Sequence, residues 1–373
     1  MSAQRQASSA SQTPHLSPAE LSYLYTSLSL PNAPIRPDGR SATQFRPLAA
    51  ETDVLPGANG SARVGFADGT QAVVGVKAEV EKTVLGSDTT AAAAAGDNDG
   101  AGVAGGDGQA PGQGHGSWVQ MSIEIPGFRD DDALPVFLAE MMREPLVESV
   151  SEGGSGGMTG GLKARLVINR RWHWRLYIDV LLLSQPLSYP LPLLSLTTHL
   201  ALLSTKLPKL KSQGEEDPFF DDDWNAAEYL YPRSATPSLK QQQVRPPVTL
   251  LVIAVGENVI FDPNREEIAV ADTVLAVSVT RNDGSDGLKL LSIRTVDPPS
   301  RLTQPGVPNT ENAATGGAAT GGGATESGEV PGVWRPRRGG VKRSTIARMA
   351  KLVLQRGGVG EEVLEGLEGV QVG

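Results

Sequence analysis

Alternation of apolar and polar residues predicts strands in both halves of the chain. In the segment 171–184, Trp172, Trp174 and Leu176 fall on one face, while the opposite face changes from polar to apolar towards its end. This pattern predicts a central strand covered on both faces. The full set of expected strands is 47–55, 60–66, 71–80, 117–125, 162–169, 171–184, 248–255, 258–261, 273–280 and 288–296.

Apolar spacing of three and four residues predicts helices between the groups of strands. The first covers residues 18–29, where Ser17 suits the N-cap and Pro18 the first helical position. Further helices are expected over 131–150, 193–207 and 341–368. The order of strands, helix, strands, helix predicts an α+β fold of two sheet–helix halves.

Two stretches rich in Gly, Ala, Thr and Pro interrupt this pattern. Residues 86–116 and 301–334 hold too few large apolar side chains to offset the entropy lost on ordering, so both are predicted to be disordered insertions. The Ser/Gln-rich residues 1–16 are expected to be disordered as well. The remainder predicts one domain over 17–300, which the first insertion interrupts and C-terminal helices within 335–373 complete.

The numbers of charged residues and cysteines limit which partners and which kinds of site the chain can have. The chain has 33 Lys and Arg against 42 Asp and Glu, a formal net charge of -9, so any contact with RNA must be local. Zero Cys excludes disulfides, thiol catalysis and cysteine-rich zinc sites. The apolar runs are shorter than a membrane span and the N-terminus lacks an apolar signal region, which predicts a soluble protein without a secretory signal.

The most specific stretch of the sequence lies between residues 22 and 80. Pro37 and Gly39 predict a turn within Arg-Pro-Asp-Gly-Arg (36–40), and Asn59-Gly60 predicts a hairpin. The order SYLY, RPDGR, QFRP, TDVLP, NGSARV resembles the N-terminus of the RNase PH-like subunits of the eukaryotic RNA exosome. The resemblance covers most of residues 18–296 and, more weakly, the final helices. It implies the RNase PH-like fold, which is ribosomal protein S5 domain 2-like, and a location in the nucleus and nucleolus and also in the cytoplasm.

Enzymes of this kind cleave RNA from its 3′ end with inorganic phosphate, which requires an anion cradle and a carboxylate. The turn at the place that the resemblance gives to the cradle, residues 184–190, contains no Gly, Lys or Arg, and its two prolines lack backbone N–H groups. Ser184 and Ser188 could bind an anion, but turn hydroxyls usually satisfy their own backbone. The turn therefore predicts no phosphate site.

A second segment, residues 260–274, resembles the family stretch that ends in Ala-Asp-x-Asp, where the last Asp lines the active site. In that register Val274 stands in place of the catalytic carboxylate, while Asp272 remains. Asp262 is interpreted as a strand-end or turn carboxylate and Glu266-Glu267 as a solvated face. No catalytic residue is therefore predicted.

Basic side chains gather in one predicted hairpin and give the candidate RNA-binding residues. Solvated strand-edge charge is an equal alternative for this group. A second basic group, within 335–343, is compatible with an RNA-binding tail or an import signal, but the pattern is not specific for either. No metal or cofactor is predicted, because the four histidines lack ligand spacing and the acidic runs 130–132 and 221–223 are typical of loops and helix starts. The hairpin candidates are Lys163, Arg165, Arg170, Arg171 and Arg175.

These observations predict a non-catalytic structural subunit of the hexameric exosome ring, which threads RNA to a nuclease subunit for rRNA maturation and mRNA turnover. The resemblance implies two kinds of partner: an RNase PH-like subunit of the mRNA-transport type as heterodimer partner, and cap proteins of the S1/KH class. The alternative from another class is an active phosphorolytic 3′-to-5′ exoribonuclease with an unrecognised phosphate site.

Overall fold

The first half of the fold is a five-stranded sheet. The computed structural model describes residues 16–31, 33–83, 114–147, 162–231, 245–281, 287–306, 333–337 and 339–370. In this sheet β3 pairs antiparallel with β2 and β5, whereas β4 runs parallel to β5. The strand order is β1 (Leu48–Thr52), β2 (Gly60–Phe66), β3 (Gln71–Lys82), β5 (Trp172–Leu182) and β4 (Val119–Glu124).

The second half is an antiparallel sheet of four strands, in which β10 lies between β8 and β11. All eight residues of β8 are buried, and so are the first eight of β10, so both faces of these strands are covered. A small separate pair, β6 (Lys206–Leu207) and β7 (Glu228–Tyr229), follows the central helix. The four strands are β11 (Leu288–Val296), β10 (Thr273–Arg281), β8 (Val248–Val255) and β9 (Asn258–Phe261).

The helices begin and end where local chemistry allows. Ser17 forms a capping box with Glu20 ahead of the first helix. Pro192 is tolerated in the first turn of α5, so that helix begins at Leu191, two residues before the expected start. The helices are α2 (Pro18–Leu28), α3 (Ala133–Val147), α4 (Leu162–Arg165), α5 (Leu191–Ser204), α6 (Arg265–Ala269), α7 (Arg343–Val353) and α8 (Val359–Glu368), with short 3-10 turns η2 (Gly116–Trp118), η3 (Trp224–Ala226) and η4 (Pro299–Leu302).

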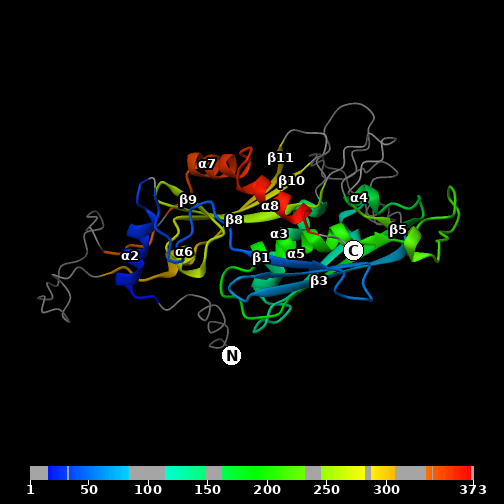
Figure 1. The fold of residues 1–373 in the computed structure, drawn as a ribbon, viewed down its shortest axis with the longest axis horizontal. Helices are drawn as coiled ribbons and strands as arrows, with labels where there is room; N and C mark the ends of the chain where they lie inside the picture. Colours follow the sequence, from blue (N-terminus) through cyan, green and yellow to red (C-terminus); the bar gives the residue numbers. More distant parts are fainter. Residues whose placement is uncertain are drawn as a thin grey trace, which may run out of the picture.

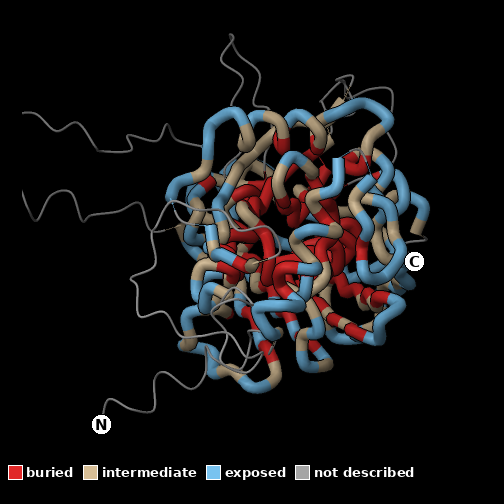
Figure 2. The backbone as a smooth tube through the Cα atoms, turned by 90° about the vertical axis from the view of Figure 1, so that its left-hand side faces the viewer, coloured by how far each residue is buried: buried red, intermediate tan, exposed pale blue. Residues whose placement is uncertain are grey.

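The central helix α5 joins the two halves into one core. Every residue of α5 is buried, and the helix packs against β2 and β3 on one side and β8 on the other (Figure 1). On the far side of the second sheet, α7 contacts β8 and β10. The buried residues form a continuous interior (Figure 2). The predicted α+β fold of two sheet–helix halves is therefore confirmed.

Two predictions about the first sheet, for the segment 162–169 and for the strand β5, are wrong. The expected strand 162–169 is the short helix α4 followed by a single bridge from Val167 to His173. The strand β5 is not covered on both faces, because Leu181 on its second face is 40% exposed and Leu183, directly after the strand, is 47% exposed. Its apolar end is therefore a feature of the molecular surface.

Most of each predicted insertion lies outside the described residues. The chain is described again from Gly114, and residues 299–302 form η4. The backbone N–H of Gly306 donates to the carbonyl of Trp334 (2.7 Å). The two ends of the second insertion therefore lie side by side on the folded body.

Candidate functional site

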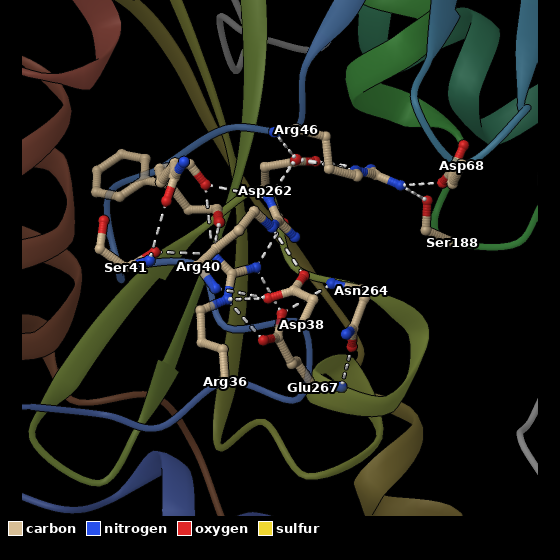
Figure 3. Close-up of polar contacts among 12 residues, drawn as sticks. Arg36, Asp38, Arg40, Ser41, Arg46, Asp68, Ser188, Asp262, Asn264 and Glu267 are labelled. Carbon is tan, nitrogen blue, oxygen red and sulfur yellow. Dashed lines mark hydrogen bonds and ion pairs between the residues drawn. The ribbon is translucent and has the colours of Figure 1, made fainter.

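The turn at residues 36–40 directs two arginines towards the second sheet. Gly39 has φ +75°, a left-handed conformation that glycine adopts at little cost, and its N–H donates to the carbonyl of Arg36 (3.1 Å). Arg36 and Arg40 therefore project to the same side and meet the chain that leaves β9 (Figure 3). Arg46 approaches the same point after the turn. We call Arg36, Arg40, Arg46, Asp262 and Glu267 the arginine–carboxylate cluster.

Arg36 and Glu267 form a fully buried ion pair at the centre of this cluster. Both side chains are 0% exposed, and two guanidinium nitrogens donate to the two carboxylate oxygens at 2.7 and 2.8 Å. Arg36 also donates to the carbonyls of Phe261 and Asp262. Glu267 completes the capping box of α6 with Asn264. Because both charges are hydrogen-bonded within the protein, this buried pair holds the N-terminal segment to α6.

Asp262 binds the other two arginines. It is fully buried and has φ +44°, which is uncommon for a residue other than glycine. Arg40 donates to its carboxylate at 2.8 Å, and Arg46 donates through two guanidinium nitrogens at 2.7 and 2.9 Å and through its backbone N–H at 2.9 Å. The carboxylate thus receives a bidentate arginine contact and two further bonds.

Arg46 extends the cluster to the turn 184–190. Its remaining terminal nitrogen donates to the Asp68 carboxylate (2.6 Å) and to the Ser188 hydroxyl (2.9 Å). The guanidinium also lies 4.3 Å from the centre of the Phe66 ring. Although partial burial acts to raise the pKa of Asp68, hydrogen bonds from Thr70 and the Arg46 charge lower it overall. The turn therefore has a cation beside it, contributed by a distant part of the sequence.

The capacity of Arg46 to bind an anion is already used. All three guanidinium nitrogens of Arg46 donate to Asp262, Asp68 or Ser188. A phosphate at the turn would have to displace an internal carboxylate and leave it without its partner. Within the described residues, the charges of the arginine–carboxylate cluster thus pair with one another, and Arg46 has no nitrogen left over for an external anion.

Several site interpretations from the sequence change here. The interpretation of Glu267 as part of a solvated face is wrong, because that side chain is buried against Arg36, whereas Glu266 is exposed. Asp262 does lie at a turn, but it is buried among arginines. Neither role has a local signal, since the partners are more than 200 residues apart in the sequence.

Val274 and Asp272, the two key positions of the segment 260–274, lie in different environments. Val274 is 2% exposed within β10, between β8 and β11. The Asp272 carboxylate accepts the backbone N–H of Gly256 (2.7 Å) and pairs with Arg337 (3.2 Å). Burial raises the pKa of Asp272, and the Gly256 bond and Arg337 only partly oppose this. None of these partners belongs to the turn 184–190.

The structure divides the five candidate RNA-binding residues among different surroundings. Arg165 donates to the carbonyl of Leu230 (2.7 Å) and stacks on the Tyr231 ring, and burial lowers its pKa. Arg175 pairs with Glu81 (3.1 Å) on the outer face of the first sheet. Both guanidinium groups therefore have partners within the chain.

Arg170 and Arg171 lie together in the loop before β5 and are mostly exposed. They face an acidic loop, in which Glu215 lies 3.8 Å from Arg170 and Asp217 lies 3.5 Å from Arg171. Lys163 lies apart from them in α4 and is half-buried. RNA contact by this group remains a prediction, with Arg170 and Arg171 as its most accessible members.

Among the residues that the structure describes there is neither a metal-binding cluster nor a membrane-spanning helix. In these ranges, no group of three or more His, Asp or Glu side chains is arranged to hold a metal ion. No helix in the same ranges is both long and apolar enough to cross a membrane.

Comparison with known proteins finds relatives at 30% identity. No family model matches the chain. It is 30% identical over 269 residues to exosome complex component RRP42 of Saccharomyces cerevisiae, covering 70% of this chain and 81% of the relative. It is also 30% identical over 280 residues to exosome complex component rrp42 of Schizosaccharomyces pombe, covering 71% and 78%.

Solved structures of exosomes are also similar. An Archaeoglobus fulgidus exosome with RNA bound to the active site has a chain that is 23% identical with a TM-score of 0.47, covering 74% of this chain and 87% of that one. A chain of an archaeal exosome core is 21% identical with a TM-score of 0.44, covering 74% and 84%.

Proposed function

The chain belongs to the family of exosome complex component RRP42, and from this premise we propose that it is a structural, non-catalytic subunit of the RNA exosome ring. In this role it supports 3′-to-5′ processing and degradation of RNA that is threaded to a nuclease subunit elsewhere. The proposal includes the partners that the sequence implied: an RNase PH-like subunit of the mRNA-transport type and cap proteins of the S1/KH class. It also includes a location in the nucleus, nucleolus and cytoplasm.

The observation that carries the non-catalytic role is the engagement of Arg46. This residue is the cation beside the turn 184–190, and Asp262 and Asp68 occupy its guanidinium. Phosphorolysis needs a phosphate dianion held at such a turn. Val274 supports the same role, because a buried valine can neither carry a proton nor bind a metal ion.

An activity assay tests the absence of catalysis. The purified full chain is incubated with a single-stranded RNA oligonucleotide, with and without inorganic phosphate, and release of nucleoside diphosphates is measured. We expect no release in either condition. Phosphate-dependent release that follows the protein through purification and disappears in the Asp272→Asn variant would establish the alternative, a phosphorolytic exoribonuclease.

Affinity purification from native extract tests the assembly role. A tagged chain should recover other exosome subunits in equal proportion, including one RNase PH-like neighbour. Recovery of the chain alone under the same mild conditions would contradict the proposal. A fluorescent fusion of the full chain tests its location in the same cells.

A further inference from the structure

The two sheets differ in how their faces are covered. In the second sheet, β8 and β10 are buried on both faces. In the first sheet, α5 packs on the inner face (Figure 1). Along β3 and β5, buried inner residues alternate with more exposed outer ones. Outer faces of antiparallel sheets usually carry polar residues when water covers them. This outer face does not follow that rule at one end.

An apolar patch crosses the outer face of β3 and β5. Val73 lies directly opposite Leu181 in the strand register, and Leu183 continues the same face of β5. Gly75, two residues along β3, leaves room for Leu55, whose side chain would lie 3.1 Å from a β-carbon at that position. Leu55, Leu181 and Leu183 are 41%, 40% and 47% exposed. We call these three leucines and Val73 the leucine patch.

A hollow of about 480 Å³ continues the patch beyond Leu55. It is lined by residues 53 and 55–59, by Lys206 and by Trp224, which is 49% exposed. A tryptophan beside an open hollow is typical of the anchor positions of protein interfaces. The patch and the hollow share Leu55, so they form one continuous surface.

We propose that this surface is a docking site for a neighbouring protein subunit of the exosome. The partner lays apolar side chains on the leucine patch and inserts one into the hollow beside Trp224. This inference rests on the proposed function, because it assigns a surface to the assembly. It names a place of contact that neither the family membership nor the fold supplies.

The charges around the surface favour protein over RNA. Asp53 lines the hollow, and Asp222 and Asp223 are exposed next to Trp224. Lys206 lies over the Tyr229 ring, 4.8 Å from its centre. Arg63, directly opposite Val73, and the exposed Lys77 add positive charge to the same face, so the rim carries both signs. RNA affinity depends on an excess of positive charge, whereas an apolar centre with a rim of mixed charge suits a protein partner. The acidic end of the rim calls for basic side chains on the partner.

Thiol labelling can test this site cleanly because the chain contains no cysteine. Leu183→Cys places a single thiol in the patch, and Leu302→Cys places one on η4, where the native side chain is 79% exposed. Each variant is labelled with a maleimide as the full chain alone and within the purified complex, and the rate is read on this chain after separation. In the complex we expect labelling at 183 to slow at least tenfold and labelling at 302 to change less than twofold.

Three results would overturn the proposal. The thiol at 183 could react equally fast in the complex and in the chain alone. It could react slowly in the chain alone, which would mean that the chain covers the patch itself. It could be protected by single-stranded RNA without partner proteins, which would make RNA the occupant. A chain that recovers no exosome subunits would instead refute the proposed function.

A disruptive variant gives an independent reading. Leu181→Glu combined with Leu183→Glu adds two charges to the patch, and Leu302→Glu is the exposed control. Both should melt within about 2 °C of the original chain, since the native side chains are substantially exposed. The double variant should reduce recovery of partner subunits at least fivefold, and the control should not. Normal recovery with the double variant would overturn the proposal.

Discussion

Glu267→Gln should destabilise the chain strongly, because it neutralises one half of a fully buried ion pair. Arg36 would keep its charge at a position with 0% exposure and would face an amide in place of a carboxylate. Removing one partner of a buried pair costs about 3–5 kcal/mol. The amide oxygen can still accept one bond, so we expect a loss near the lower end, about 3 kcal/mol of unfolding free energy.

The assay is thermal unfolding followed by tryptophan fluorescence on the full chain. At about 2 °C per kcal/mol for a chain of this size, the melting temperature should fall by about 6 °C. Glu266→Gln is the matched control, since it removes the same charge from the same turn of α6 at an exposed position. Its expected cost is about 0.3–1 kcal/mol through the helix dipole.

The difference in melting temperature between Glu267→Gln and Glu266→Gln tests whether the buried charge stabilises the fold. Added salt at 1 M should leave their difference nearly unchanged, because a buried pair is screened far less than a surface pair. If the two variants melt within about 2 °C of each other, Glu267 does not stabilise the fold through its charge. The cluster would then not be what holds the N-terminal segment in place.

Three further predictions concern other parts of the chain. Burial raises the pKa of Asp272, so the folded state binds the proton of this carboxyl more tightly than the unfolded state does. The carboxyl therefore destabilises the fold as pH rises from its ordinary pKa to its raised pKa. Melting measured from pH 7 to pH 4 should favour the original chain over Asp272→Asn as pH falls, and a constant difference in melting temperature would contradict this. Arg170→Glu with Arg171→Glu should lower the melting temperature by no more than about 4 °C, since the two exposed pairs contribute about 0–1 kcal/mol each at about 2 °C per kcal/mol. The double variant should still weaken RNA binding by the assembled complex and reduce the salt dependence of that binding. Arg129→Glu is the exposed control, and unchanged RNA affinity would leave Arg170 and Arg171 as surface charge. Deleting residues 308–331 should leave melting and co-purification unchanged, because a 2.7 Å backbone hydrogen bond already joins the flanking segments, whereas a fall above about 5 °C would show that the deleted residues pack.

The elements themselves could be predicted from the sequence because their signals are local. Alternation located β2 and β9 with their observed bounds, and the Ser17 cap with Pro18 located the start of α2. The segment 162–169 failed because a short apolar run does not distinguish a strand from a helical turn. The covering of β5 also failed, since an apolar face on a strand can meet another subunit as well as the chain's own core.

By itself, the sequence determined the α+β order of elements, the turn at 36–40, the absence of cysteine chemistry and, through the order of its motifs, the family. Only the tertiary structure decided that Arg36 meets Glu267 and that Arg46 reaches Ser188 from 142 residues away. The physical reason is that ion pairs depend on distance in space and have no period along the chain. The same holds for the leucine patch, whose members come from three segments and become one surface only in the register of β3 and β5.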